Sequence, residues 1–265
     1  MLIIADNLDE VVARHDRVIG FFGAPPRRAL KEAEERFGVG FVDLDVYYGA
    51  PASKLLPDAY CHIIRNCVDN AVALGGRLAC VIAATGKEKC DAGRYAAWLI
   101  RDAVGAEVVV TENKDLPEPF SAALCEARGM VKDRIVRIMR GIVEPPRRED
   151  LEQARASKCE PTHGFWGTPP HPIGLLDLFP ETTHVFGWTR CVEQGRPSDL
   201  ELEMTVPDDL PIVFFSQGFC PKAQLARYLA EKHRGMHVDV HDSLNAATHA
   251  KIEAFIRLSV PGGGL

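Results

Sequence analysis

The chain has 265 residues, of which 46% are hydrophobic and 26% charged, and its formal net charge is −6. A chain of this length can bury a core without covalent cross-links, and an acidic net charge gives no general attraction to nucleic acid or to anionic membrane surfaces. We therefore expect partners among small molecules and proteins, with no nucleic acid and no membrane.

The N-terminal segment predicts neither a signal peptide nor a membrane anchor. Its apolar run after Met1 is only three residues long, and no basic region accompanies it. No apolar stretch approaches the roughly 20 residues that a membrane-spanning helix needs. We expect a cytoplasmic protein, in which the eight cysteines are reduced thiols available as ligands or nucleophiles.

The first half of the chain alternates between strand and helix signals. The apolar run Leu78–Ala84 is flanked by Gly75-Gly76 and Thr85-Gly86, which is typical of a strand covered on both faces. Repeated alternation requires crossover connections, so it predicts a parallel α/β unit. The expected strands are 17–22, 39–46, 78–84 and 107–111, and the expected helices are 27–37, 58–74, 89–104 and 119–142.

Pro145-Pro146 marks the expected boundary between a first α/β domain, residues 1–145, and the remainder, residues 146–265. The remainder is expected to begin with a helix, to continue as a compositionally different linker strap, and to end in a smaller α/β domain. Its expected helices are 148–156, 221–232 and 246–258, and its expected strands are 184–188, 212–216 and 237–240. The predicted fold class is α/β, with two Rossmann-like units whose mainly parallel sheets face a common cleft.

Four cysteines fall where an α/β protein builds its ligand site. Cys90, Cys191 and Cys220 each follow a predicted strand, and Cys61 lies near the start of a predicted helix. Ligands of parallel sheets bind outside the carboxyl ends of the strands, and a helix N-terminus favours the thiolate that metals require. We therefore predict a cysteine-ligated metal centre in the cleft. The cysteines on apolar faces, interpreted as core residues, are Cys67, Cys80 and Cys125.

The stretch 159–172 carries two histidines among aromatic, proline and glycine residues and is too irregular for a helix. Long irregular loops in compact domains are usually functional, so His163 is a candidate general acid or base near neutral pH. An ordered strap packed by its own aromatic residues is the structural alternative. An alternative zinc site would draw its ligands from Cys159, His163, Cys191 and Cys220.

Other motif signals are weaker. Thr85 and Gly86 follow a predicted strand, and their N–H groups offer an anion site for a cofactor. The Walker pattern is absent, no GxGxxG follows the first strand, and the chain has no GxSxG elbow at Ser216. These motifs therefore give no support to a P-loop NTPase, a nicotinamide dinucleotide enzyme or an α/β-hydrolase.

Two short motifs carry a family resemblance. They are Tyr60-Cys61-His62-Ile63-Ile64-Arg65 near a helix start and Cys90-Asp91-Ala92-Gly93-Arg94 after an apolar strand. In this order they resemble the 2-hydroxyacyl-CoA dehydratase and benzoyl-CoA reductase subunit family, over about half of the chain. The resemblance implies two α/β domains, a [4Fe–4S] cluster held by three cysteines, and a separate ATP-driven activator protein as electron donor.

The resemblance also implies ligand roles. Cys61 and Cys90 correspond to cluster ligands, and the third ligand is expected in the second domain. The strand where the family carries that cysteine reads Val238-Asp239-Val240-His241-Asp242-Ser243 here and contains none. Cys191 or Cys220 would take its place.

We therefore expect an anaerobic iron–sulfur protein, a lyase or oxidoreductase, that acts in a reductive or radical reaction on a small acid or acyl thioester. Its expected partners are a small-molecule substrate, a redox activator protein and further subunits in a homo- or hetero-oligomer. A zinc-dependent transferase or hydrolase is one alternative. A non-catalytic binding or assembly protein, whose cysteines are core residues, is the other.

Overall fold

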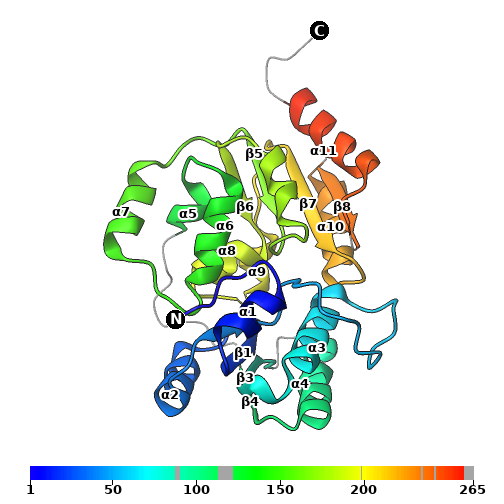
Figure 1. The fold of residues 1–265 in the computed structure, drawn as a ribbon. Coiled ribbons are helices and arrows are strands. Elements are labelled where there is room, and N and C mark those ends of the chain that lie inside the picture. The colour runs from blue at the N-terminus through cyan, green and yellow to red at the C-terminus, as the bar shows by residue number, and fades with distance from the viewer. Residues whose placement is uncertain (87–89, 113–121, 198, 234, 242, 260–265) are drawn as a thin grey trace. The chain divides into compact units, whose positions relative to one another are not determined.

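The computed structural model describes residues 1–86, 90–112, 122–197, 199–233, 235–241 and 243–259. The chain divides into two α/β units (Figure 1). The first comprises residues 1–114 and 142–144, and the second comprises 115–141 and 145–265. This division differs from the boundary expected at residue 145, because helices α5 (Ala123–Glu126) and α6 (Val131–Arg140) pack in the second unit.

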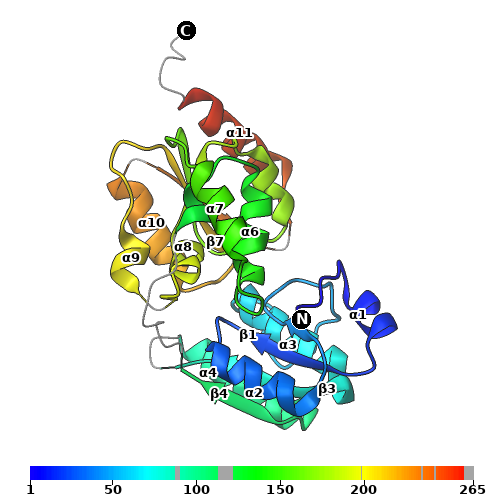
Figure 2. The same cartoon turned by 90° about the vertical axis from the view of Figure 1, so that its left-hand side faces the viewer.

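The first unit is built on a four-stranded parallel sheet in the order β2-β1-β3-β4. Its two central strands are buried along their whole length, as expected for apolar runs covered on both faces. The strands are β1 (Val18–Phe22), β2 (Phe41–Asp43), β3 (Leu78–Ala84) and β4 (Val108–Thr111). The helices are α1 (Leu8–Arg14), α2 (Arg27–Phe37), α3 (His62–Leu74) and α4 (Asp91–Val104), with a 3₁₀ turn η1 (Gly75–Arg77) before β3 (Figure 2).

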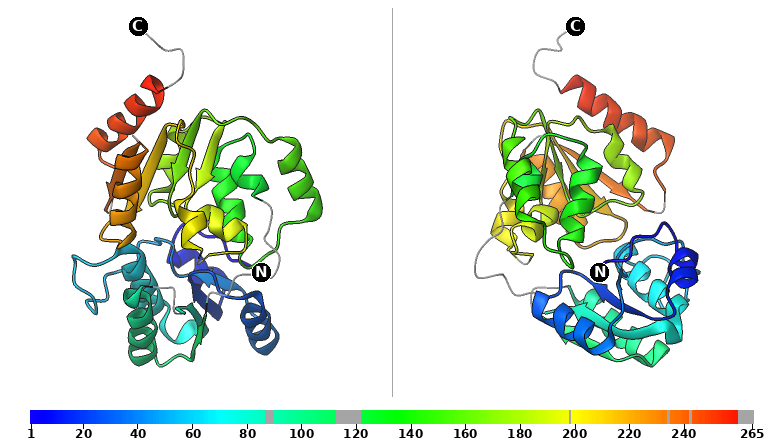
Figure 3. Two further views of the ribbon diagram at one scale, coloured as in Figure 1. Left: turned by 180° about the vertical axis from the view of Figure 1, so that it is seen from behind. Right: turned by 60° about the vertical axis from the view of Figure 1, so that its left-hand side comes forward.

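The second unit repeats this topology with the order β6-β5-β7-β8, again parallel in every pair. Its strands are β5 (His163–Trp166), β6 (Thr183–Phe186), β7 (Ile212–Gln217) and β8 (Met236–Val240). Besides α5 and α6, its helices are α7 (Arg148–Ala156), the 3₁₀ helix η2 (Ile173–Leu178), α8 (Trp188–Glu193), α9 (Leu200–Met204), α10 (Lys222–Lys232) and α11 (Ala246–Leu258) (Figure 3). Two Rossmann-like units with parallel sheets, predicted from the alternation of elements, are confirmed.

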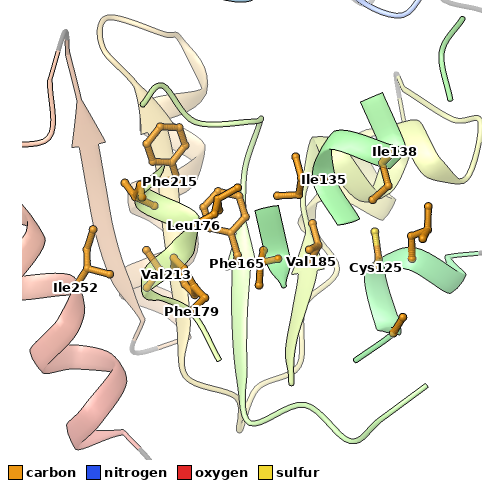
Figure 4. Packing of buried hydrophobic residues seen from close by; sticks show 14 of the residues in the cluster. Cys125, Ile135, Ile138, Phe165, Leu176, Phe179, Val185, Val213, Phe215 and Ile252 are labelled. Carbon is orange, nitrogen blue, oxygen red and sulfur yellow. The ribbon is translucent and has the colours of Figure 1, made fainter. Parts of the chain in front are cut away.

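The core of the second unit lies on both faces of β5 and β7. Phe165 and Phe215 stack on one face, with ring centroids 5.9 Å apart, and pack with residues of α6, η2 and α11 (Figure 4). Trp166 and Phe214 pack on the opposite face with α10, with ring centroids 5.9 Å apart. Because successive strand residues point to opposite faces, a central strand that is covered twice must be apolar at every position.

The linker strap expected around His163 is wrong in part. Residues His163–Trp166 form β5, which pairs with β6 on one side and β7 on the other. All four residues are buried. The segment therefore lacks the alternation of polar and apolar residues that marks a strand with one face in solvent. A four-residue strand between proline-rich loops also gives too short a run for a periodic signal.

The single helix expected at 119–142 is wrong as well. The described part of this segment contains two helices, α5 and α6, separated at residues 127–130. Gly129 there has a φ of 136°, which interrupts a helix. Residues 119–121 lie outside the described part of the chain, as does residue 89 at the expected start of α4. No described helix combines the length and apolar character needed to cross a membrane.

Candidate functional site

The topology of each sheet creates a switch point at its carboxyl edge. The first strand of each sheet lies between the second and the third, so chain connections leave it in opposite directions. In open parallel sheets, ligands bind in the crevice that this reversal produces. The switch points of this protein lie between β1 and β3 in the first unit, and between β5 and β7 in the second.

Cys61 and Cys90 both lie at the start of helices in the first unit. Cys61 is the N-cap residue of α3 and is buried, whereas Cys90 is the N-cap residue of α4 and is exposed. Burial raises the pKa of the Tyr60 hydroxyl, and the Cys90 and Cys61 thiols raise it further. The two helices that these thiols begin contact each other, and the role of the pair as ligands stays a prediction.

Thr85 and Gly86 follow β3 directly and are both buried. The backbone N–H of Thr85 already donates to the carbonyl oxygen of Thr111, at 3.0 Å. This N–H is engaged in a hydrogen bond between neighbouring strand ends and is not available to an anion. The anion site predicted at Thr85 and Gly86 therefore has one donor fewer than expected. The role of Gly86 stays a prediction.

A cluster of acidic groups lies at the same edge of the first unit, beyond β2. The Asp45 carboxylate accepts the backbone N–H of Gly23 at 2.7 Å and the thiol of Cys67 at 3.0 Å. Asp43 in turn accepts the backbone N–H of Asp45 at 3.0 Å. The carboxylates thus fasten the loop after β2 to the end of β1 and to α3.

Asp43 and two groups near it, Tyr48 and Cys67, have raised pKa values. Burial raises the pKa of Asp43 well above its ordinary value, and the adjacent Asp45 carboxylate raises it further. Burial and then Asp43 raise the pKa of the Tyr48 hydroxyl. Burial also raises the pKa of the Cys67 thiol, with further contributions from both carboxylates.

Neither Asp43 nor Asp45 is among the site residues predicted from the sequence. Their position in the sequence was a usable signal for a site. Both acids lie near the end of a predicted strand, and ligands of parallel sheets bind outside the carboxyl ends of the strands. Cys67, interpreted as a core residue, is fully buried but also hydrogen-bonded to Asp45. Two side-chain amides of α3 also bind this loop. Asn66 donates to the carbonyl oxygen of Asp45, and Asn70 donates to the carbonyl oxygens of Leu44 and Val46.

The two predicted thiols of the second unit differ in environment. Cys191 lies inside the short helix α8 and is fully buried, with its thiol 3.6 Å from the carbonyl oxygen of Asp199. Burial raises the pKa of Cys191 to about 12. Cys220 lies in the turn between β7 and α10 and is partly exposed. Both thiols follow the carboxyl end of a strand, Cys191 after β6 and Cys220 after β7, but of the two only Cys220 is partly exposed.

His163 lies at the opposite end of its sheet, because it is the first residue of β5. Its side chain is buried, with Nε2 donating to the carbonyl oxygen of Ile256 at 2.9 Å and Nδ1 3.1 Å from the Thr162 hydroxyl. Burial lowers the pKa of this imidazole. Both ring nitrogens already have partners, and the ring joins β5 to α11.

The alternative zinc ligands are not brought together. The Cys159 thiol lies 4.0 Å from His184 Nε2, a nitrogen that donates to the carbonyl oxygen of Cys159. Across the described stretches, no group of three or more histidine, cysteine, aspartate or glutamate side chains is placed to hold a metal ion.

The carboxyl edge of the second unit is held by Gln217. Its side-chain oxygen accepts the backbone N–H of His171 at 2.8 Å, and its nitrogen donates to the carbonyl oxygens of Val240 and His241 at 2.9 and 2.8 Å. His171 follows β5, whereas Val240 ends β8 and His241 follows it, so one buried amide on β7 joins the ends of its two neighbouring strands. Gln217 is not among the site residues predicted from the sequence.

A serine, a histidine and an aspartate also meet on β7 and β8. The Ser216 hydroxyl donates to Asp239 at 2.8 Å and lies 3.1 Å from His237 Nε2. In a nucleophilic triad, the histidine accepts the serine proton and the aspartate holds the histidine. Here the serine hydroxyl donates its hydrogen bond to the carboxylate and not to the histidine, so the arrangement is a cross-strand hydrogen-bond network.

Comparison with known proteins yields neither a matching family model nor a matching curated protein.

Proposed function

We propose that Cys61 and Cys90 are ligands of an iron–sulfur centre, and that the protein acts in a reductive reaction on a small acid or acyl thioester. One observation carries the proposal. The two cysteines occupy the N-caps of α3 and α4, two helices that contact each other in the first unit. Protein iron–sulfur clusters are held by cysteine thiolates, which is the form that a helix N-terminus favours.

The donor set supports two ligands in the first unit. Among the described residues no third donor completes a group with Cys61 and Cys90. The further ligand predicted from the sequence, Cys191 or Cys220, stays a prediction. The pKa of Cys191 is raised to about 12, so its thiol resists deprotonation, whereas Cys220 is partly exposed.

The acidic cluster supplies a group for proton transfer. When bound, the centre would supply electrons, and a reduction also requires protons. Asp43 keeps its proton to a higher pH than an ordinary carboxyl because it is buried beside Asp45. In this proposal Asp43 stores a proton at the ligand edge, and Asp45 holds the β1 loop and α3 in place around it.

Anaerobic reconstitution with ferrous iron and sulfide tests the proposal. The native chain should bind both elements and turn brown, and Cys90→Ser should lose most of the iron. Cys125→Ser is the matched control, because Cys125 is fully buried in the core of the second unit. Equal iron and sulfide in both variants would contradict the proposal, and bound zinc without iron would favour the zinc alternative.

A further inference from the structure

Helix α3 carries two asparagines on the face that meets the loop after β2. The Asn70 side-chain nitrogen donates to the carbonyl oxygens of Leu44 at 3.0 Å and Val46 at 2.7 Å. Asn66, one turn earlier on the same face, donates to the carbonyl oxygen of Asp45 at 3.2 Å. Three successive carbonyl groups therefore bind two side-chain amides, and we call this pair, Asn66 and Asn70, the amide clamp.

The segment that the clamp binds is also fixed by other parts of the first unit. The backbone N–H of Leu44 donates to the carbonyl oxygen of Phe21 in β1 at 2.7 Å. The backbone N–H of Asp45 donates to the Asp43 carboxyl group at 3.0 Å. Backbone groups that leave water need hydrogen-bond partners, and this turn obtains them from β1, from Asp43 and from α3. The backbone around Asp45 is therefore held on more than one side.

A held backbone sets the direction of the Asp45 carboxylate. One carboxylate oxygen accepts the backbone N–H of Gly23 at 2.7 Å, and the other accepts the Cys67 thiol at 3.0 Å. An asparagine amide offers two N–H donors on one nitrogen, and Asn70 uses its nitrogen for the carbonyl groups on either side of Asp45. Asn70 is 1% exposed, so a leucine of similar shape would leave both carbonyl groups without these donors.

The position of Asp45 matters for the buried Asp43 carboxyl group. The titratable groups that interact with Asp43 are Asp45 and Tyr48 from the same loop and Cys67 from α3. Burial raises the pKa of Asp43 most, and the Asp45 charge raises it further. An Asp45 carboxylate that turned toward solvent would remove the second contribution and would admit water to Asp43.

We propose that the amide clamp is a positioning device that keeps the Asp45 carboxylate beside Asp43, with Asn70 as its main residue. The inference rests on the proposed function, in which Asp43 stores a proton for a reduction. Its tests use the metal-free chain and measure neither iron nor turnover. They therefore give the same answer about the clamp whether or not the chain binds an iron–sulfur centre.

The first measurement is the titration of the aspartate carboxyl groups by NMR, with carbon-13 in the aspartate side chains. In the native chain Asp43 should titrate well above the ordinary value of 3.8, and loss of its signal in Asp43→Asn assigns it. Asn70→Leu should lower the Asp43 midpoint by about one pH unit. Val72→Ala, at an exposed position of the same helix, is the matched control and should leave the midpoint unchanged. Equal midpoints in the native chain and Asn70→Leu would overturn the proposal.

Thiol labelling separates positioning from a general loss of stability. Cys67, whose thiol contacts Asp45, should react with iodoacetamide at least about tenfold faster in Asn70→Leu, because the loop opens locally. Cys80, which is buried in β3 of the same unit, should keep its native rate. Equal acceleration of both thiols would show that Asn70 supports the unit as a whole, and this result would also overturn the proposal.

Asn66→Leu tests the clamp through its other member. It removes one hydrogen bond of 3.2 Å, so the Asp43 midpoint and the Cys67 labelling rate should change in the same directions by smaller amounts. If Asn70→Leu does not fold, Asn66→Leu decides the question. A native Asp43 midpoint together with a native Cys67 rate in this variant would then reject the clamp.

Discussion

The thiol of Cys67 and the carboxylate of Asp45 form a hydrogen bond of 3.0 Å at the ligand edge of the first unit. The cysteine comes from helix α3 and the aspartate from the start of the loop that connects β2 to α3, 22 residues earlier in the chain. The same carboxylate accepts the N–H of Gly23 after β1. One side chain thereby connects three segments around the predicted cysteine site.

Removal of the Asp45 carboxylate should destabilise the first unit. Asp45→Ala leaves the Gly23 N–H and the Cys67 thiol without their acceptor, and each lost contact to a charged group costs about 1–3 kcal/mol of unfolding free energy. Urea unfolding should show a lower midpoint for this variant. Asp16→Ala, at an exposed position, is the control and should leave the midpoint unchanged. Equal midpoints would mean that solvent replaces both hydrogen bonds.

Asp43 should make stability fall as the pH rises. Its folded pKa lies well above the ordinary value of 3.8, so the folded chain binds a proton more tightly than the unfolded chain. The stabilisation is complete below the ordinary pKa and is lost as the pH rises through the folded pKa, by about 1.4 kcal/mol for each unit of displacement. The Asp43→Asn variant cannot ionise and should lack this decline.

Unfolding free energies measured from about pH 4 to pH 7 would test this sign. The curves of the native chain and of Asp43→Asn should diverge progressively toward neutral pH. Parallel curves would show that the carboxyl ionises in the folded chain as readily as in the unfolded one.

Thiol reactivity should separate the cysteines by exposure. In metal-free protein at neutral pH, Cys90 and Cys220 should react with iodoacetamide faster than Cys125 and Cys191, because only thiolate in contact with solvent reacts. Burial raises the pKa of Cys191 to about 12 and that of Cys125 well above its ordinary value. Mass spectrometry of peptides after timed labelling measures each rate. Rapid labelling of Cys191 would contradict its buried position.

His163 should contribute to folding through its two hydrogen bonds. His163→Ala removes the donor to the Ile256 carbonyl oxygen and leaves a cavity, so it should lower the unfolding free energy by about 2–4 kcal/mol. Because burial lowers the pKa of His163, the native chain should also lose stability as the pH falls below the ordinary value of 6.5. A variant with unchanged unfolding free energy but reduced turnover would instead support the proton-transfer role.

The amino-acid sequence by itself determined the fold class. Unbroken apolar runs such as Leu78–Ala84 require cover on both faces, and their alternation with amphipathic helices requires parallel crossovers. It also placed Cys61 and Cys90 at helix starts, because the capping position depends on residues that are near in the chain. Local signals were sufficient for these features.

Only the tertiary structure decided the environment of each candidate side chain. His163 became part of a central strand through pairing with β6 and β7, and Cys191 became inaccessible inside α8. The Cys67 thiol acquired its hydrogen bond to Asp45 across 22 residues of chain, and burial in the folded unit raised the pKa values of Asp43 and Cys67. Burial and hydrogen bonding are set by residues distant in the chain, and no local pattern of residue types records which of them will meet.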